Sequence, residues 1–479
     1  MNFARDVVEA APRGQRALLE IARDGARREW SFGQVAEASG AVAAHLAGAG
    51  LRRGDVVLTL VGNRPEWALT MVACFRLGLV ALPCNEQLRA KDLEQRLAVA
   101  QPRYVVCDVR NAEVLAASGW DGPTLWAPWD LPSSPAVPGA VDLDPDDPCL
   151  ITFTSGTAGE PKAVLHGQRY LSGQMLQARH WLDARAGDLV WCTAASGWSK
   201  SARNAFIAPW LRGAAALLHD ARFDPHERLE LLDRERVDLL CMAPTEYRVI
   251  AKRATLPGLI DLRGAVAAGE ALNPQVLEAW HEASNIWVRD GYGQTETGQL
   301  TGMPLGIPAR PGSMGIPLPG VRLDVEDGEL VADPTSVPTF FLRYLGEDPP
   351  ASGELWRTGD RVTRDDDGFL HFVSRTDDVI ISAGYRIGPF EVESALVSHI
   401  AVAEAAVVAA PDDERGSVVR AVVVLRDGYE PSGDLASELQ DHVKTQTAPY
   451  KYPRVVDFAA ELPKTASGKV RRAALRDRH

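Results

Sequence analysis

A short apolar run followed by a loop of small polar residues constrains the fold of this chain more than any other segment. Residues 149–153 have the pattern of a buried strand, and the loop Thr-Ser-Gly-Thr-Ala-Gly-Glu-Pro-Lys follows directly at residues 154–162. Its glycines let backbone N–H groups approach an anion, its hydroxyls donate hydrogen bonds, and Lys162 adds a positive charge. The loop lacks the G-x-x-x-x-G-K-[ST] pattern of the common phosphate-binding loop. By itself it is equally typical of a plain turn between two elements.

Helical and strand patterns alternate along the first part of the chain. Apolar residues from Val35 to Leu46 recur at helical spacing, and this pattern stops at Gly48. Between Pro123 and Pro138, prolines recur without periodicity, which predicts a connecting loop. Such alternation favours an α/β fold with helices packed on largely parallel sheets. The predicted strands lie at residues 56–61, 104–106, 237–240 and 264–267.

The character of the chain changes twice toward its C-terminus. Segments become short and rich in Gly and Pro over residues 312–372, which suits a small β-barrel or sandwich. After Asp377 we predict a compact α+β module, with strands at 405–409 and 420–425 and a helix at 434–445. Because 479 residues exceed one ordinary core, we predict a large N-terminal domain over residues 1–376 and a small C-terminal domain over residues 377–479.

Overall charge and cysteine usage exclude several classes of protein. The chain contains 51 Lys and Arg against 64 Asp and Glu, a formal net charge of −13, which argues against binding to nucleic acid or to an anionic membrane surface. The basic tail from Lys469 to Arg478 has the spacing of a solvated helix face. No secretory or transit pattern begins the sequence, and no apolar stretch approaches membrane-spanning length. The six cysteines lack a C-x-x-C pattern and are expected to be buried free thiols. Together these features predict a cytoplasmic protein.

Four further polar motifs follow the first loop in a fixed order. They are Asp-Gly-Tyr-Gly-Gln-Thr-Glu at 290–296, Trp-Arg-Thr-Gly-Asp at 356–360, Ser-Arg-Thr-Asp-Asp at 374–378 running into Ile-Ser-Ala-Gly-Tyr-Arg at 381–386, and Leu-Pro-Lys-Thr-Ala-Ser-Gly-Lys at 462–469. This ordered set resembles the adenylate-forming superfamily of acyl-CoA synthetases, peptide-synthetase adenylation domains and luciferases. The resemblance runs over nearly the whole chain, and several motifs in order are far more specific than any one of them.

The resemblance implies a two-step reaction that uses ATP, Mg²⁺ and coenzyme A. A carboxylate attacks the α-phosphorus of ATP and releases pyrophosphate, and a thiol then takes the acyl group and releases AMP. Since charge develops on phosphate oxygens in both steps, preorganised donors and cations should carry the catalysis. Lys469 is expected to bridge the attacking carboxylate and the α-phosphate, Thr295 to contact the α-phosphate, and Glu296 to bind Mg²⁺.

The same resemblance implies an ATP/AMP site in the large domain. Tyr292 is expected to stack on adenine, Asp360 to accept both ribose hydroxyls, and Arg375 to reinforce the nucleotide site. Ala158 stands where the family has Thr or Ser, which removes one hydroxyl contact to phosphate but leaves the backbone donors. The expected nucleotide-binding residues are Thr154, Ser155, Gly156, Thr157, Gly159, Lys162, Gly269, Glu270, Ala271, Asp290, Gly291, Tyr292, Gly293, Gln294, Thr295, Asp360, Arg375 and Lys469.

Residues 2–7, 196–198, 385–393 and 448–454 look specifically like medium-chain acyl-CoA synthetases. Trp198 is therefore expected to form a wall of the acyl pocket. Gly293 stands where acetyl-CoA synthetases carry Trp, which implies room for a medium-chain, branched or aromatic acid. The implied CoA contacts are Gln87, Ala383, Gly384, Tyr385, Arg386, Arg415, Lys444, Tyr452, Pro453 and Arg454.

Asp377 matches the hinge of the family. Members rotate the small domain between an adenylating pose, which Lys469 serves, and a thioester-forming pose, which the loop from Ala383 to Tyr385 serves. Gly384 has no side chain, so a pantetheine arm could pass close to the backbone there.

Several alternatives stay open from the sequence. A lone lysine near a C-terminus is usually a mobile surface residue, and Arg386 and Arg415 could be ordinary surface arginines. One rival function is a stand-alone adenylating enzyme that loads an acyl or aryl acid onto the phosphopantetheine of a carrier protein. Another is a non-catalytic nucleotide-binding protein, against which Glu296, Asp360 and Lys469 weigh. For the oligomeric state, we consider a homodimer.

Overall fold

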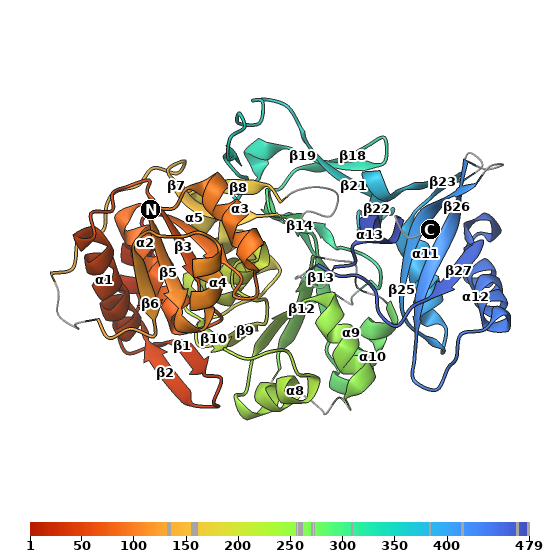
Figure 1. The fold of residues 1–479 in the computed structure, drawn as a ribbon, viewed down its shortest axis with the longest axis horizontal. Helices are drawn as coiled ribbons and strands as arrows, with labels where there is room; N and C mark the ends of the chain where they lie inside the picture. The colour runs from red at the N-terminus through yellow and green to blue at the C-terminus, as the bar shows by residue number, and fades with distance from the viewer. Residues whose placement is uncertain are drawn as a thin grey trace.

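Two seven-stranded sheets form the larger part of the molecule, with helices between and around them (Figure 1). The computed structural model describes residues 1–131, 136–154, 161–254, 256, 262–269, 272, 274–307, 310–382, 385–412, 416–465 and 469–476. The first sheet has the order β13 (Val288–Gly291), β12 (Gly264–Ala268), β11 (Leu239–Met242), β9 (Leu189–Cys192), β10 (Ala215–His219), β1 (Arg16–Ile21) and β2 (Arg27–Ser31). The second has the order β20 (Arg343–Tyr344), β8 (Ala163–Gly167), β7 (Pro148–Phe153), β4 (Val80–Cys84), β3 (Val56–Leu60), β5 (Tyr104–Asp108) and β6 (Thr124–Ala127).

Helices connect these strands. The longer ones are α1 (Phe32–Gly48), α2 (Pro65–Leu77), α3 (Ala90–Ala100), α5 (Arg169–His180), α8 (Pro225–Arg234), α9 (Pro244–Arg253) and α10 (Pro274–Ser284). The shorter ones are η1 (Ala4–Glu9), η2 (Val109–Asn111), α4 (Ala112–Ala117), α6 (Ser199–Ala202), η3 (Arg203–Ile207) and α7 (Ala208–Leu211). Local sequence explains their starts: α1, for example, follows a capping box in which the Ser31 hydroxyl accepts the Gln34 N–H at 3.2 Å.

Strand pairing confirms the predicted parallel architecture. β3 pairs with β4 and β5 in parallel, and β11 does so with β9 and β12. Antiparallel pairs occur toward the sheet margins, between β1 and β2 and between β7, β8 and β20. The predicted loop at 123–138 is wrong at its start, because residues 124–127 form β6. Leu125 and Ala127 of this strand are buried. The free energy gained by burying them outweighs the tendency of the nearby prolines to break a strand.

The helices form layers on both faces of each sheet. One buried cluster joins the two sheets through α1, α2 and α7, with Val42, Trp67 and Trp210 among its members. A second cluster covers the other face of the first sheet with α8, α9 and α10. A third packs α3 and α4 on the outer face of the second sheet. This layered core holds the carboxyl ends of the first sheet's parallel strands at one edge, where loops can build a site.

A small antiparallel sheet lies beyond the two large ones. It contains β18 (Leu323–Glu326), β19 (Glu329–Ala332), β21 (Trp356–Arg364) and β22 (Leu370–Arg375) in that order. The sequence predicts a small β-barrel or sandwich over residues 312–372, and these four strands form one antiparallel sheet. Its register places Asp360 opposite Arg375. Short segments nearby are β14 (Gly293–Gln294), β15 (Gly298–Gln299), β16 (Thr301–Gly302), β17 (Ile316–Pro317) and η4 (Pro334–Ser336).

The C-terminal part is an α+β module, as predicted. Its three-stranded sheet contains β25 (Val402–Asp412), β26 (Gly416–Leu425) and β27 (Val455–Phe458), and its own buried cluster forms against α11 (Pro389–Ser398) and α12 (Gly433–Gln446). Figure 1 shows this module at one end of the molecule, beside α9, α10 and the small sheet. The remaining elements are η5 (Thr376–Asp378), β23 (Ile380–Ser382), β24 (Tyr385–Ile387), η6 (Pro449–Lys451) and α13 (Arg472–Arg476).

The cysteines meet the expectation from composition. All six cysteines are buried and free, and burial raises the pKa of the Cys84 and Cys107 thiols to about 12. Within the described ranges, no helix combines the length and apolar character that crossing a bilayer requires.

Candidate active site

A cavity of about 1160 Å³ lies where the first large sheet, the small sheet and the C-terminal module meet. Much of its wall follows the carboxyl ends of parallel strands: Thr193 comes after β9, Ala243 after β11, Gly269 after β12 and Tyr292 after β13. Open α/β sheets bind ligands at this edge because the connecting loops there are free to carry polar groups. The cavity is therefore where the predicted site residues should gather.

One end of the cavity carries the predicted phosphate contacts. Thr154 and Lys162 line it and hold each other through two hydrogen bonds, the Thr154 hydroxyl accepting the Lys162 N–H at 3.0 Å and the Thr154 N–H donating to the Lys162 carbonyl at 2.9 Å. These bonds fix the base of the loop, whose predicted contacts Ser155, Gly156, Thr157 and Gly159 lie outside the described residues, as does Ala158.

Glu296 lies in a polar network at the same end. The Tyr344 hydroxyl donates to its carboxylate at 2.8 Å, and the Lys162 ammonium lies 4.4 Å from the Tyr344 ring centre. Lys162 also pairs with Glu347 at 2.9 Å. Burial is the main cause that raises the pKa of Tyr344, with Glu296 adding to it, so this hydroxyl stays protonated and donates. Tyr344 was not predicted as a site residue, because it lies far from Glu296 along the chain and a contact over that distance cannot be read from the sequence.

A second cluster lies around Asp360, the predicted ribose contact. The Tyr292 hydroxyl donates to Asp360 at 2.5 Å, and the Gln294 amide donates to the same carboxylate oxygen at 3.1 Å. Arg375 lies 3.4 Å from the other oxygen of Asp360. Burial raises the pKa of Asp360, while Arg375, the two hydrogen bonds and Lys469 act in the opposite direction. The structure thus brings the predicted adenine, ribose and nucleotide-reinforcing residues together.

Other predicted nucleotide residues also line the cavity. Gly269 has φ of +105°, and a Cβ there would meet the Lys200 ammonium at 3.3 Å, so the backbone passes close to polar groups. Asp290, Gly291 and Thr295 line the same wall. Glu270 and Ala271 lie outside the described residues.

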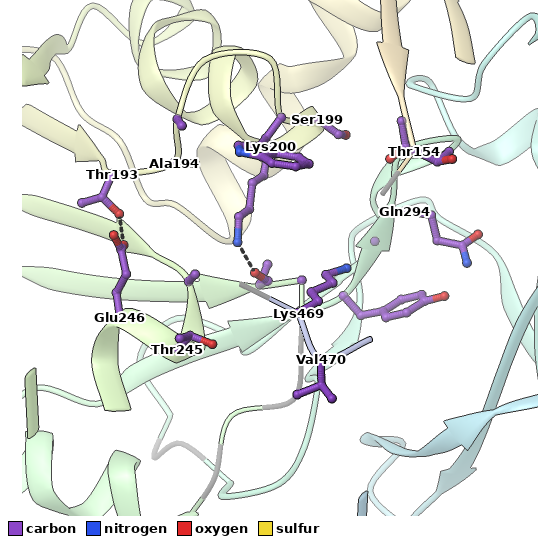
Figure 2. A pocket seen from close by; sticks show the side chains of 18 of the residues that line it. Thr154, Thr193, Ala194, Ser199, Lys200, Thr245, Glu246, Gln294, Lys469 and Val470 are labelled. Atoms are coloured by element: carbon purple, nitrogen blue, oxygen red, sulfur yellow. Dashed lines mark hydrogen bonds between the residues drawn. The ribbon is translucent and has the colours of Figure 1, made fainter. Parts of the chain in front are cut away.

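Lys469 reaches the cavity from the C-terminal module. Its segment forms a turn in which the Thr465 N–H donates to the Lys469 carbonyl at 2.7 Å and the Lys469 N–H donates to the Thr465 hydroxyl at 3.2 Å. Figure 2 shows the Lys469 and Lys200 side chains both extending into the cavity, from different parts of the chain. The lysine therefore lies where a carboxylate and a phosphate could meet, rather than on the open surface.

The acyl-pocket argument from Gly293 needs correction. Trp198 and Gly293 both line the cavity. A Cβ at position 293, however, would overlap the carbonyl oxygen of Gly298 and lie 2.9 Å from the Cα of Gln299. A side chain there would push into the β14–β15 backbone, so the glycine is required by close backbone packing, and its lack of a side chain is no measure of acyl-chain length.

The predicted CoA contacts separate into two groups. Gln87 lines the cavity, whereas the C-terminal candidates are not among its described lining residues. On the C-terminal module, Tyr385 stacks on Tyr450 with ring centres 4.3 Å apart. Lys444 and Arg454 lie 4.4 and 5.0 Å from the ring centre of Tyr452. Pro453 lies between Tyr452 and Arg454 in the chain. Arg386 lies in β24. The other candidates, Ala383, Gly384 and Arg415, lie outside the described residues.

The C-terminal tail differs from the predicted solvated helix face. Arg476 pairs with Asp378 at 2.5 Å, and Arg472 pairs with Asp378 at 3.5 Å and with Glu393 at 2.8 Å. Asp377, the predicted hinge, lies in η5 directly before Asp378. Helix α13 is therefore tied to the segment that joins the small sheet to the C-terminal module, a contact that spacing along the chain could not reveal.

The carboxylates of the cavity fit a Mg²⁺ ion that is bound together with a nucleotide. Glu296 offers one carboxylate beside Lys162, and the described residues contain no group of three or more His, Cys, Asp or Glu that could hold a metal by themselves. Mg²⁺ commonly uses one or two carboxylates together with substrate phosphates and water. The structure thus suits an ion held largely by ATP.

Comparison with known proteins agrees with this site. The model of the AMP-binding enzyme family matches residues 5–364, and that of the AMP-binding enzyme C-terminal domain matches residues 391–469. The chain is 39% identical to an uncharacterized acyl–CoA ligase, YtcI, of Bacillus subtilis, over 100% of this chain and 96% of the relative. It is 39% identical to the mitochondrial acyl-coenzyme A synthetase ACSM4 of Mus musculus, over 99% and 90%. A crystal structure of the anthranilate CoA ligase AuaEII in complex with anthranoyl-AMP superposes with a TM-score of 0.89 at 28% identity, over 99% and 96% of the two chains.

Fold and cavity together define an enzyme that activates an acid with ATP. The chain belongs to the AMP-binding enzyme family. Within it, the chain is an AMP-forming acid–CoA ligase that uses ATP, Mg²⁺ and coenzyme A and works through an acyl-adenylate.

Proposed function

We propose that this enzyme activates a medium-chain, branched or aromatic carboxylic acid and transfers it to coenzyme A. The observation that carries the proposal is the cavity in which Lys469 faces the Tyr292–Asp360 cluster, next to the Trp198 wall. The similarity to an anthranilate CoA ligase supports an acid larger than acetate.

In the first step, an oxygen of the acid attacks the α-phosphorus of ATP, and the bond from that phosphorus to the bridging oxygen of pyrophosphate breaks. Lys469 stabilises the charge between carboxylate and α-phosphate, and Thr295 donates to the α-phosphate. Thr154 and Lys162 hold the β- and γ-phosphates. Asp360 accepts the ribose hydroxyls, and Tyr292 packs on adenine. Glu296 would hold Mg²⁺, which would supply positive charge beside the phosphates.

In the second step, the CoA sulfur attacks the acyl carbon, the carbon–oxygen bond to AMP breaks, and the thiol proton passes to solvent. We assign the residues from 377 to 479 to a domain that rotates about Asp377 between the steps. Its CoA candidates support this assignment, since Tyr385, Lys444, Tyr452 and Arg454 lie apart from the cavity while Lys469 occupies it.

An acid panel tests the proposal. The purified enzyme is mixed with ATP, Mg²⁺ and acetate, hexanoate, octanoate or benzoate, and pyrophosphate release is measured with and without CoA. We expect acid-dependent pyrophosphate release, with stoichiometric acyl-CoA and AMP when CoA is added. A thioester formed on a phosphopantetheinylated carrier protein but not on CoA would contradict the proposed acceptor.

We also propose a cytoplasmic location and a homodimeric assembly. Buried free thiols support a reducing compartment. Cell fractionation and light scattering of the purified enzyme measure the two properties separately.

A further inference from the structure

One tyrosine of the cavity wall contacts two of the side chains that we propose act on the phosphates. Tyr344 lies in β20, is half-buried and lines the cavity. Its hydroxyl donates to Oε1 of Glu296 at 2.8 Å, and the Lys162 ammonium lies 4.4 Å from the centre of its ring. Glu296 and Lys162 come from distant parts of the chain, so Tyr344 joins two segments that the sequence keeps apart.

The backbone around Tyr344 fixes its place relative to both partners. β20 pairs with β8, and Tyr344 lies opposite Val164, two residues after Lys162. Three residues before Tyr344, the Phe341 N–H donates to the Glu296 carbonyl at 2.8 Å. The segment that carries Tyr344 is therefore bonded on one side to the strand after the phosphate loop and on the other side to the backbone of Glu296.

The ring of Tyr344 is held by the core. The ring of Phe341, which is buried, packs edge-on against it with ring centres 4.9 Å apart. Phe341 in turn packs on Trp356 at 5.3 Å. Edge-to-face contacts of this kind favour particular ring orientations. Because the hydroxyl extends from a ring fixed in this way, it meets Glu296 in a defined position.

The hydroxyl restricts the carboxylate of Glu296. A free glutamate side chain loses much rotational freedom when it binds an ion, and that loss opposes binding. Tyr344 occupies Oε1, whereas the other oxygen has no hydrogen-bond partner among the described residues. Mg²⁺ commonly uses one or two carboxylates together with substrate phosphates. Outer groups that orient a metal ligand in this way typically change metal affinity or activity by about 10–100-fold.

The ring acts on Lys162 in a different way. The Lys162 ammonium also pairs with Glu347 at 2.9 Å, and both side chains of this pair are about half exposed. Such exposed ion pairs contribute little stability, so a phosphate group can replace Glu347. The contact with the face of the Tyr344 ring does not use the N–H donors of the ammonium. It therefore keeps Lys162 at this end of the cavity while the donors turn to a phosphate.

We propose that Tyr344 is a positioning residue for adenylation: its hydroxyl orients Glu296 toward the metal that accompanies ATP, and its ring keeps Lys162 beside the same phosphates. The inference rests on the proposed function and deepens it, because it adds a residue that acts through two of the proposed contacts at the phosphate end.

Binding of ATP tests the hydroxyl without any turnover. Calorimetry gives the Kd of ATP without acid or CoA, once with Mg²⁺ and once with EDTA, and the ratio of the two values is the gain in affinity due to the metal. Tyr344→Phe keeps the ring and removes only the hydroxyl, so we expect this gain to fall by about tenfold or more. The Kd in EDTA should stay close to the wild-type value. Tyr429→Phe, at an exposed tyrosine after β26, is the control and should keep the wild-type gain.

A double-mutant cycle shows whether the hydroxyl acts through Glu296. In Glu296→Gln, which offers no carboxylate, adding Tyr344→Phe should lower the gain by no more than about twofold, because two residues that act as one unit are not additive. The melting temperature verifies that each variant is folded. A loss by the same factor in both backgrounds would be a general structural effect and would overturn the proposal, as would an undiminished gain in Tyr344→Phe.

Tyr344→Leu tests the ring. It removes the hydroxyl and the ring face together, so the Kd of ATP in EDTA should rise about two- to fivefold above that of Tyr344→Phe. An equal Kd in the two variants would overturn the role toward Lys162.

These binding measurements are independent of acid ligation. If the gain depends on Tyr344 and Glu296 as expected but no acid gives pyrophosphate, the proposed function fails and the positioning role stands. If an acid gives pyrophosphate but the wild-type affinity for ATP does not depend on Mg²⁺, the positioning role fails and the proposed function stands.

Discussion

At the scale of single residues, Asp360 connects the groups that we propose bind the nucleoside. Its carboxylate accepts from Tyr292 and Gln294 and faces Arg375, although burial alone would favour its neutral form. A carboxylate that accepts these hydrogen bonds beside an arginine is already oriented to accept further hydroxyl groups. In the proposed role these are the ribose hydroxyls of ATP.

We predict that Asp360→Ala raises the KM for ATP by about 10²-fold, since charge-assisted hydrogen bonds to ribose are lost and the Tyr292 and Gln294 donors are left unpaired. Initial rates at varied ATP measure the effect. Asp366→Ala, at an exposed carboxylate after β21, is the control and should retain the wild-type KM. An unchanged KM in Asp360→Ala would remove Asp360 from the nucleotide site.

Gly293 is constrained by backbone packing. We predict that Gly293→Ala lowers the free energy of unfolding by about 1–3 kcal/mol, because the added Cβ overlaps the Gly298 backbone and cannot be accommodated by a side-chain rotation. Urea unfolding measures it. Gly433→Ala is the control, since a Cβ there meets nothing within 4 Å. Equal stability of Gly293→Ala and the wild type would show that β14 and β15 can separate at no cost.

His166 should make stability depend on pH. Burial lowers its pKa in the folded state to about 3, so between pH 3 and 6.5 the unfolded chain binds the proton more readily and stability falls as the pH falls. From pH 7 to pH 5 this loss is at most about 2 kcal/mol for one such group. His166→Gln should show a shallower fall in urea unfolding at these two pH values, with a remainder from His219, whose pKa burial lowers to about 4. The same fall in both proteins would contradict the assignment.

At the scale of elements, η5 connects the small sheet to the C-terminal module, and Asp378 at its end binds α13 through Arg472 and Arg476. A rotation about this segment would either break these ion pairs or move α13 together with Asp378. We predict that Asp377→Pro keeps adenylation but slows transfer to CoA by about tenfold or more, because proline fixes φ and restricts the preceding residue.

Single-turnover measurements distinguish the two half-reactions of Asp377→Pro. Acyl-AMP formation is followed without CoA, and acyl-CoA formation is followed after CoA is added to the preformed adenylate. Asp377→Ala, which leaves the backbone free, is the control and should transfer at the wild-type rate. Unchanged transfer in Asp377→Pro would move the hinge elsewhere.

At the scale of the whole molecule, sequence patterns predicted the architecture well where it depends on local periodicity. The strands at 149–153 and 264–267, the helix at 434–445 and the change of character near 312 are all present. The pattern failed at residues 124–127, where prolines obscured a strand that pairing with β5 stabilises. Burial against a neighbouring strand is not a local property, so no window of sequence could show it.

The site was predictable in part. The order of the polar motifs, through the family resemblance, assigned Tyr292, Asp360 and Lys469 to one site, and all three line the cavity. Contacts across long stretches of chain were missed, such as that of Tyr344 with Glu296. The Gly293 interpretation failed because the direction of an absent side chain depends on the backbone around it.

The half-reactions of Lys469→Ala test most directly whether this one cavity makes the acyl-adenylate from which CoA later takes the acyl group. With an accepted acid, ATP and Mg²⁺, we predict that pyrophosphate release falls about 10³-fold, because the cation is lost where charge develops. Transfer from supplied acyl-AMP to CoA should change by only a few-fold, since the proposed rotation removes Lys469 before that step, and Lys91→Ala, at an exposed lysine of α3, should retain both rates. Equal loss in both half-reactions, or undiminished pyrophosphate release, would contradict the assignment of Lys469 to adenylation.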